Sequence, residues 1–199
     1  MVVIARATAM TRVKNNIQLA QSQPSIESRL YPLIDGIVND ICAIAKPTED
    51  GRLQLQCHSQ CLFSSDEDDS AQIPDCAGCV WDPIKSIMWP AFWFEAKPLP
   101  ALDWLTSEAA ASVAAVIFQQ SIPQLRNQAA HAFATFKDQT QYHVFLFVGI
   151  FWSMLIIDRD REVKANDHIK KMVSQIDLSQ IVRYLHGHLQ RYRKHMRRL

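Results

Sequence analysis

The chain has 199 residues, of which 48% are hydrophobic and 21% charged, and its formal net charge is +1. This length and composition suit one soluble globular domain and argue against global disorder or a collagen-like chain. Five cysteines, an odd number, without an apolar signal-peptide core argue against a secreted disulfide framework, so we expect an intracellular protein of the nucleus or cytoplasm.

Residues 1–24 form a basic N-terminal segment. Three cations, Arg6, Arg12 and Lys14, occur there without any acidic residue. An acid-free start of this kind resembles a mitochondrial presequence, which makes the mitochondrion an alternative location.

Residues 25–45 predict an amphipathic helix. Ser25 suits its N-terminal cap, and Pro32 predicts a kink. The apolar residues recur at helical spacing and are Ile26, Leu30, Leu33, Ile34, Ile37, Ile41 and Ile44.

Strand-like runs come next. In residues 52–63, Leu53, Leu55 and Cys57 alternate with polar residues, which is the period of a half-buried strand. The acidic run SSDEDDSA predicts a solvated loop, because such a dense charge cannot be buried.

Residues 73–81 and 90–97 predict two further strands. The connection between them contains Pro83 and Pro90, so we expect a hairpin with a long loop. This hairpin carries most of the residues on which the functional argument depends.

The second half of the chain begins with a helix over residues 106–138, which Pro123 should divide or kink. The apolar run 144–157 is too short to cross a bilayer and is rich in β-branched and aromatic residues, so it predicts buried strands that meet at Gly149. From Asp167 onward the pattern is again helical. Together the elements predict an α/β fold with a sheet covered by helices.

Glu-x-Lys occurs twice. The copy Glu162-Val163-Lys164 lies in the charged run DRDREVK, which predicts a solvated turn. The copy Glu95-Ala96-Lys97 instead ends an apolar strand and so carries two charges into an element that should face the core. A plain salt bridge at the end of the strand is the alternative to a functional site there.

Residues two apart on a strand share a face, so Trp93, Glu95 and Lys97 should project together. Phe92, Phe94 and Ala96 should pack on the other side. Pairing of the two strands would bring Asp75 next to Glu95, and two adjacent carboxylates repel unless a cation such as Mg²⁺ or Mn²⁺ lies between them.

Ile73-Pro74-Asp75 followed by Glu95-Ala96-Lys97 resembles the signature of the PD-(D/E)XK nuclease superfamily. The predicted elements also resemble its αβββαβ restriction-endonuclease-like core, a central mixed sheet flanked by helices, and the aromatic surroundings look similar to fungal members. The resemblance implies a nuclease-like core over residues 25–160. Residues 161–199 would then be a basic, helical C-terminal extension packed on that core.

The resemblance also implies roles for these side chains. Asp75 and Glu95 would bind Mg²⁺ or Mn²⁺, and Lys97 would position the attacking water. Many members carry an acid on the first helix and some a glutamine on the helix after the lysine strand, although surface side chains are an alternative at these positions. The candidates here are Glu27, with Asp35 and Asp40 as weaker choices, and Gln124, with Gln120 and Gln128 as alternatives.

Four cysteines suggest a competing site. Cys57-x3-Cys61 and Cys76-x2-Cys79 have nearly the spacing of a structural Zn²⁺ site. Cys76 and Cys79 would face opposite ways on a regular strand, however, and buried free thiols are the commoner use of such residues. Zinc is therefore the less favoured cofactor.

The sequence thus predicts an endo- or exonuclease that hydrolyses phosphodiester bonds with Mg²⁺ or Mn²⁺, with DNA favoured over RNA and no membrane partner. The basic C-terminal helix would contact phosphates or form the surface for a homodimer or another protein. Two alternatives stay open: a catalytically silent domain of the same fold that acts as an interaction module, and a zinc-stabilised binding domain.

Overall fold

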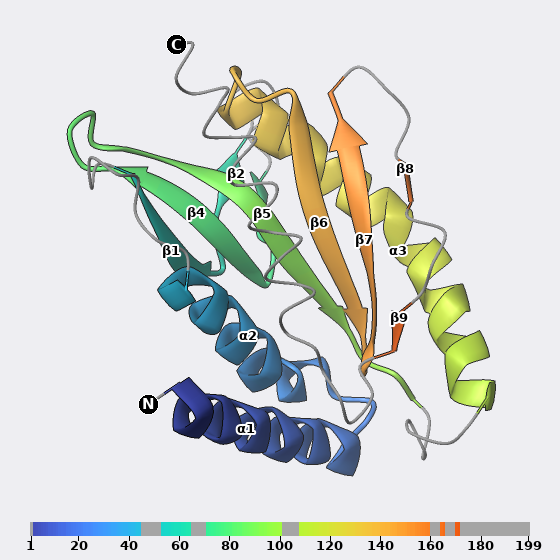
Figure 1. Cartoon of the computed structure of the whole chain (residues 1–199). Helices are drawn as coiled ribbons and strands as arrows, with labels where there is room; N and C mark the ends of the chain where they lie inside the picture. Colours follow the sequence, from blue (N-terminus) through green and yellow to red (C-terminus); the bar gives the residue numbers. More distant parts are fainter. Residues whose placement is uncertain are drawn as a thin grey trace.

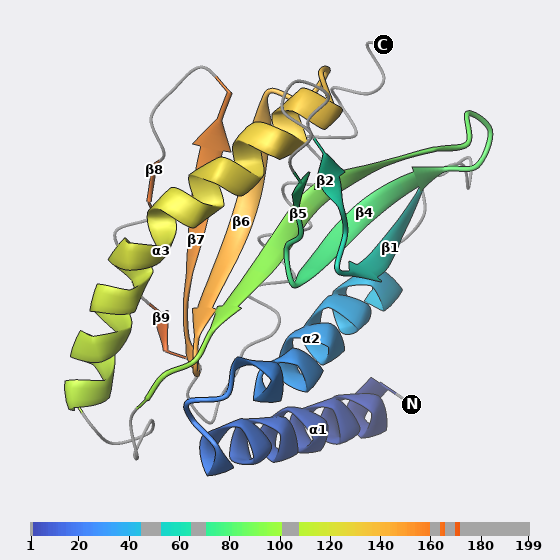
Figure 2. The same ribbon diagram turned by 180° about the vertical axis from the view of Figure 1, so that it is seen from behind.

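The computed structural model of the chain describes residues 2–44, 53–64, 71–100, 108–159, 164–165 and 170–171. A twisted β-sheet forms the centre (Figure 1). Helices α1 (Val2–Ser22) and α2 (Tyr31–Ile44) lie on one side of the sheet, and α3 (Glu108–Thr135) covers the other side (Figure 2). The predicted α/β class with helices on the faces of a sheet is confirmed.

The sheet is mixed, with the strand order β1-β4-β5-β6-β7. Strands β5 and β6 pair in parallel, and the other neighbours in this order pair antiparallel. The parallel pair requires the crossover that α3 supplies. The strands are β1 (Gln54–Ser59), β4 (Cys76–Asp82), β5 (Ile87–Lys97), β6 (Gln141–Val148) and β7 (Phe151–Asp158).

Four very short strands complete the described part of the chain. Strands β2 (Phe63–Ser64) and β3 (Ala71–Gln72) form a separate antiparallel pair beside α3. Strands β8 (Lys164–Ala165) and β9 (Lys170–Lys171) both pair with β7. The acidic loop predicted between β2 and β3 lies mostly outside the described residues.

The core fills the space between the sheet and the helices. On α2, the residues buried at helical spacing include Leu33, Ile34, Ile37 and Ile41, as their pattern predicts. On the central strands the largest buried side chains are aromatic, and each gains roughly 1.5–3 kcal/mol from burial. These aromatic residues include Phe92, Trp93, Phe94, Tyr142, Phe145 and Phe147.

The predicted start of the first helix, at residue 25, was wrong. Glu27–Arg29 forms a 3₁₀ turn (η1), and the α-helix starts at Tyr31. Pro32 therefore lies in the first helical turn, where its missing N–H breaks no hydrogen bond, and it does not interrupt a longer helix. Most of the basic N-terminal segment folds as α1, which packs on α2 and η1, and its Val13 and Ala20 are buried.

The β4–β5 hairpin is present, but its loop is short. Only residues 83–86 separate the strands, and Pro90 lies inside β5. Gly78 pairs with Phe92 while Cys79 pairs with Pro90, so one residue of β5 is extra and forms a bulge, a place where a proline fits a strand. The Phe92 ring lies over Gly78 so closely that a Cβ there would come within 2.2 Å of it.

Two predictions for the second half of the chain differ in outcome. The helix α3 runs unbroken through the exposed Pro123, so of the two predicted outcomes, a division or a kink, the division was wrong. Gly149, with φ 58°, does lie at the junction between β6 and β7. Within the residues described, no helix is long and apolar enough to cross a membrane.

The charged region after β7 also departs from expectation. Lys164, predicted in a solvated turn, belongs to β8, and the helix predicted from Asp167 is replaced by β9 at Lys170–Lys171. The outer edge of β7 offers unpaired backbone groups, and these short strands hydrogen-bond to them. The remainder of the predicted C-terminal helix, residues 172–199, lies outside the described residues.

Candidate active site

The C-terminal end of β5 carries the charged residues of the candidate site. Its side chains alternate as expected: Trp93, Glu95 and Lys97 share the face toward α3, and Phe92 and Phe94 face the other way. On that other face the rings of Phe94 and Phe145 stack with their centroids 4.9 Å apart. This aromatic packing stabilises β5 on the face opposite Glu95 and Lys97.

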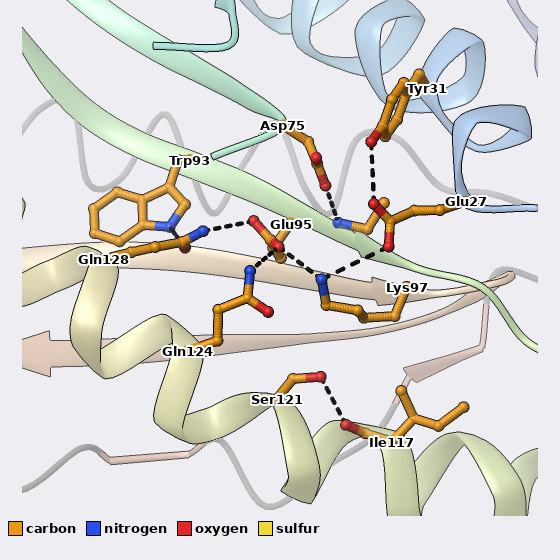
Figure 3. Close-up of polar contacts among 11 residues, drawn as sticks. Glu27, Tyr31, Asp75, Trp93, Glu95, Lys97, Ile117, Ser121, Gln124 and Gln128 are labelled. Atoms are coloured by element: carbon orange, nitrogen blue, oxygen red, sulfur yellow. Dashed lines mark hydrogen bonds and ion pairs between the residues drawn. The ribbon is translucent and has the colours of Figure 1, made fainter. Parts of the chain in front are cut away.

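Glu95 is held by hydrogen bonds from three side chains, although only 3% of its surface is exposed. Its Oε1 accepts from Lys97 Nζ at 2.8 Å and from Gln124 Nε2 at 2.6 Å, and its Oε2 accepts from Gln128 Nε2 at 2.8 Å (Figure 3). Trp93 Nε1 donates to Gln128 Oε1 at 3.0 Å. The indole thereby fixes which end of the Gln128 amide points at the carboxylate.

Asp75 lies in a bend directly before β4. Its Oδ2 accepts from the backbone N–H of Ala96 at 2.6 Å, and its own carbonyl accepts from Gln60 N at 3.1 Å. Burial, and then the neighbouring charge of Glu95, raise the pKa of Asp75 to about 6. The two carboxylates therefore lie close enough to repel each other.

Lys97 is placed among several carboxylates. In addition to Glu95, its Nζ lies 3.7 Å from Glu27 Oε2, at the start of the η1 turn. Burial acts to lower the pKa of Lys97, but the hydrogen bond and charge of Glu95, with Glu27 and Asp75, raise it above its usual value. At neutral pH the side chain of Lys97 is therefore an ammonium ion, which carries a positive charge and donates hydrogen bonds.

Tyr31 is a member of this cluster that sequence reasoning missed. Its hydroxyl donates to Glu27 Oε1 at 3.0 Å (Figure 3). Burial and the nearby carboxylates of Asp75 and Glu27 raise the pKa of the phenol. The four-residue spacing from Glu27 was the only available signal, and it means little without knowing that Glu27 faces the site.

The structure separates the other candidate residues. Gln124 and Gln128 both reach Glu95, whereas Gln120 is exposed on α3. Asp40 pairs with Arg12, and Asp35 accepts from Ser59 Oγ at 3.3 Å, so these two acids do not join the cluster.

The comparisons with known proteins add little to this geometry. No family model and no curated protein matches the sequence. Among solved structures, the chain is similar to one in the "cryoEM structure DrdV-DNA complex", with 9% sequence identity and a TM-score of 0.42 over 88% of this chain and 94% of that one. So weak a likeness carries no argument.

A divalent cation would find two carboxylates here. Within the described residues, no three His, Cys, Asp or Glu side chains are grouped so that they could hold a metal ion. Asp75 and Glu95 alone suit Mg²⁺ or Mn²⁺, because such hard cations keep several waters and take few protein oxygens. Burial and the charge of Glu95 raise the pKa of Asp75, and a cation between the two carboxylates would offset their repulsion, so the residues fit such an ion.

The four cysteines of the predicted zinc site lie in two pairs. Cys57 Sγ is 3.4 Å from Cys76 Sγ, and Cys61 Sγ is 3.9 Å from Cys79 Sγ. A single Zn²⁺ would have to draw both pairs together. Zinc binding by these cysteines therefore stays a prediction, which analysis of the metal content of the purified protein would test.

Proposed function

We propose that this protein is a nuclease that hydrolyses phosphodiester bonds with Mg²⁺ or Mn²⁺, in DNA rather than RNA. The observation that supports it is the gathering of Asp75, Glu95 and Lys97 at the end of one strand, with Glu27 against the lysine. These side chains come from three separate elements. A structural ion-pair network does not require a half-buried carboxylate, Asp75, beside a buried one, Glu95, because their repulsion is destabilising.

Each of these residues has a chemical task in that reaction. A cation on Asp75 and Glu95 would supply a Lewis acid and lower the pKa of a bound water. Lys97 would donate a hydrogen bond to the attacking water or offset the charge of the phosphate.

The glutamines orient the carboxylate that shares the cation. Gln128 is buried and fixed by Trp93, so it acts on Glu95 alone, whereas Gln124 is exposed and can also meet a substrate. Affinity for the nucleic acid backbone would come from residues 178–199, which hold six basic residues and no acid.

A second candidate function is a catalytically silent interaction module. One observation favours it: Glu95 is almost fully buried, and its oxygens already accept three hydrogen bonds. A cation would have to share these oxygens with Lys97 and the glutamines.

A cleavage assay separates the two functions. Purified protein is incubated with single- and double-stranded DNA and RNA, in Mg²⁺, Mn²⁺ or chelator. Lys97→Ala is the test variant, and Lys85→Ala, on the exposed β4–β5 turn, is the matched control.

We expect metal-dependent cleavage of DNA that falls at least about 100-fold in the Lys97→Ala variant, because a preorganised charge at the phosphate is lost. The Lys85→Ala variant should cleave like the unmodified protein. Equal cleavage by both variants would place the activity elsewhere. A folded protein that cleaves no substrate would favour the silent module.

A further inference from the structure

The proposed nuclease site leaves the cysteines without a role, yet four of the five lie in close pairs. The Sγ atoms of Cys57 and Cys76 are 3.4 Å apart, and those of Cys61 and Cys79 are 3.9 Å apart. A covalent S–S bond is about 2.05 Å long, so each pair needs a closure of about 1 to 2 Å. Both contacts join the β1 region to β4.

The two pairs have the same design. Cys57 and Cys61 are each half-buried, and each is the more exposed member of its pair. Cys76 and Cys79 are each fully buried and have their half-buried partner as a direct neighbour. Peroxide-sensing thiols have this arrangement, an accessible sulfur beside a second one that resolves its oxidised form.

The electrostatics agree with this division of roles. The hydrogen bond with Cys79 lowers the pKa of the Cys61 thiol, although burial opposes the shift. Likewise the hydrogen bond with Cys76 lowers the pKa of Cys57. The half-buried member of each pair is thus the better source of thiolate, which is the reactive form.

We propose that Cys57–Cys76 and Cys61–Cys79 are oxidation sites at which a peroxide converts each thiol pair into an intramolecular disulfide. The half-buried thiolate attacks the peroxide, an S–O bond forms and the O–O bond breaks, and the released oxygen takes a proton to leave as water or an alcohol. The buried thiol then attacks that sulfur, the S–S bond forms, and the S–O bond breaks to release water. Two thiols supply the two electrons that reduce one peroxide.

This inference stands apart from the proposed nuclease function, because neither step uses the residues of that site. A disulfide would link β4 either to β1, through Cys57, or to Cys61, two residues beyond the end of β1, and would restrict the unfolded chain. Oxidation should therefore raise the Tm of the protein, and a dithiol reductant should reverse the change.

The test counts thiols in the full chain before and after hydrogen peroxide, by alkylation under denaturing conditions and mass spectrometry. The reduced protein should take up one label on each of its five cysteines, and the oxidised protein should keep a label on Cys42 alone. Peptide mapping should find the two expected linkages. Each disulfide also lowers the intact mass by about 2 Da.

Variants make the assignment specific. Cys57→Ser should lose the first disulfide and keep the second, and Cys61→Ser the reverse. The matched control Cys42→Ser should form both. If a variant fails to fold, peptide mapping of the oxidised, unmodified protein still shows whether the two proposed disulfides form.

Three outcomes would overturn the proposal. One is retention of all five labels after peroxide treatment. Another is oxidation that yields disulfide-linked dimers or sulfinic acids in place of internal bonds. The third is zinc that co-purifies with the protein and shields the four thiols from alkylation until a chelator removes it.

Discussion

The two faces of β5 differ in how they are held, although their residues alternate along one strand. On one face, Phe92 and Phe94 pack against Phe145 through non-directional burial. On the other, Glu95 and Lys97 are held by hydrogen bonds and ion pairs of defined geometry. The comparison teaches that the aromatic face provides the rigid support a buried charge cluster needs, and that the two faces should fail in different ways.

The largest effect is expected from the aromatic face. Phe94→Ala removes a fully buried ring and leaves a cavity, so it should lower the free energy of unfolding by about 3–5 kcal/mol. Urea unfolding measures this change. Ile84→Ala, at a side chain that is 75% exposed, is the control and should stay within about 0.5 kcal/mol. A loss under about 1 kcal/mol for Phe94→Ala would mean that this face does not support the strand.

Substitutions on the polar face should lower the free energy of unfolding less than Phe94→Ala does. The size of the loss should depend on how deeply the substituted side chain is buried. Gln128→Leu leaves both Trp93 Nε1 and Glu95 Oε2 without their buried partner, which should lower the free energy of unfolding by about 2–4 kcal/mol. Gln124→Leu removes a bond at an exposed glutamine and should cost about 1 kcal/mol or less. Equal losses in the two variants would show that the Trp93–Gln128–Glu95 chain adds nothing beyond a surface contact.

Asp75 should make the polar face sensitive to pH. Its pKa rises from 3.8 to about 6 on folding, so the folded protein binds this proton more tightly than the unfolded chain does. The free energy of unfolding should therefore fall by about 2–3 kcal/mol as the pH rises from about 4 to about 6, and level off above that.

Asp75→Asn tests this assignment, because it keeps an oxygen for Ala96 N–H but cannot ionise. The variant should lose the slope in that pH window and exceed the unmodified protein in stability at pH 7. Added Mg²⁺ should stabilise the unmodified protein more than the variant. A variant with an unchanged pH profile would assign the slope to another group.

A small effect, similar to that of Gln124→Leu, is expected at the edge of the cluster. Tyr31→Phe removes the hydroxyl that donates to Glu27 and should lower the free energy of unfolding by about 1 kcal/mol. Chemical denaturation at pH 7 measures it. A change as large as that of Gln128→Leu would mean that Tyr31 belongs to the buried part of the network.

The sequence predicted most directly what depends on local period. Alternation along residues 92–97 was enough to separate the two faces of β5, and helical spacing was enough to find the buried side of α2. Proline was read less well. Pro90 lies at a bulge and Pro32 in a first helical turn, two positions that tolerate a missing N–H. Pro123 lies on an exposed face within a helix that continues past it.

Contacts between distant segments were harder to predict. Asp75 could be placed near Glu95 because hairpin pairing relates the two strands, although its bond to Ala96 N–H could not be foreseen. Which glutamine of α3 reaches Glu95 depends on how the helix crosses the sheet; the sequence favoured Gln124 over Gln120 and Gln128, and both Gln124 and Gln128 reach it. The contact between Cys61 and Cys79 depends on the path of the chain after β1. The alternation of residues along a strand does not predict that path.

The parallel pairing of β5 with β6 has a consequence for how quickly the chain folds. Phe94 and Phe145 meet across these strands although the whole of α3 lies between them in the sequence. Contacts so distant in sequence slow folding, because the chain loses the entropy of a long loop before the pairing stabilises it. During that interval the aromatic strands β5 and β6 are exposed with unpaired edges, so a dilute or cooled refolding mixture should yield more native protein than a concentrated warm one.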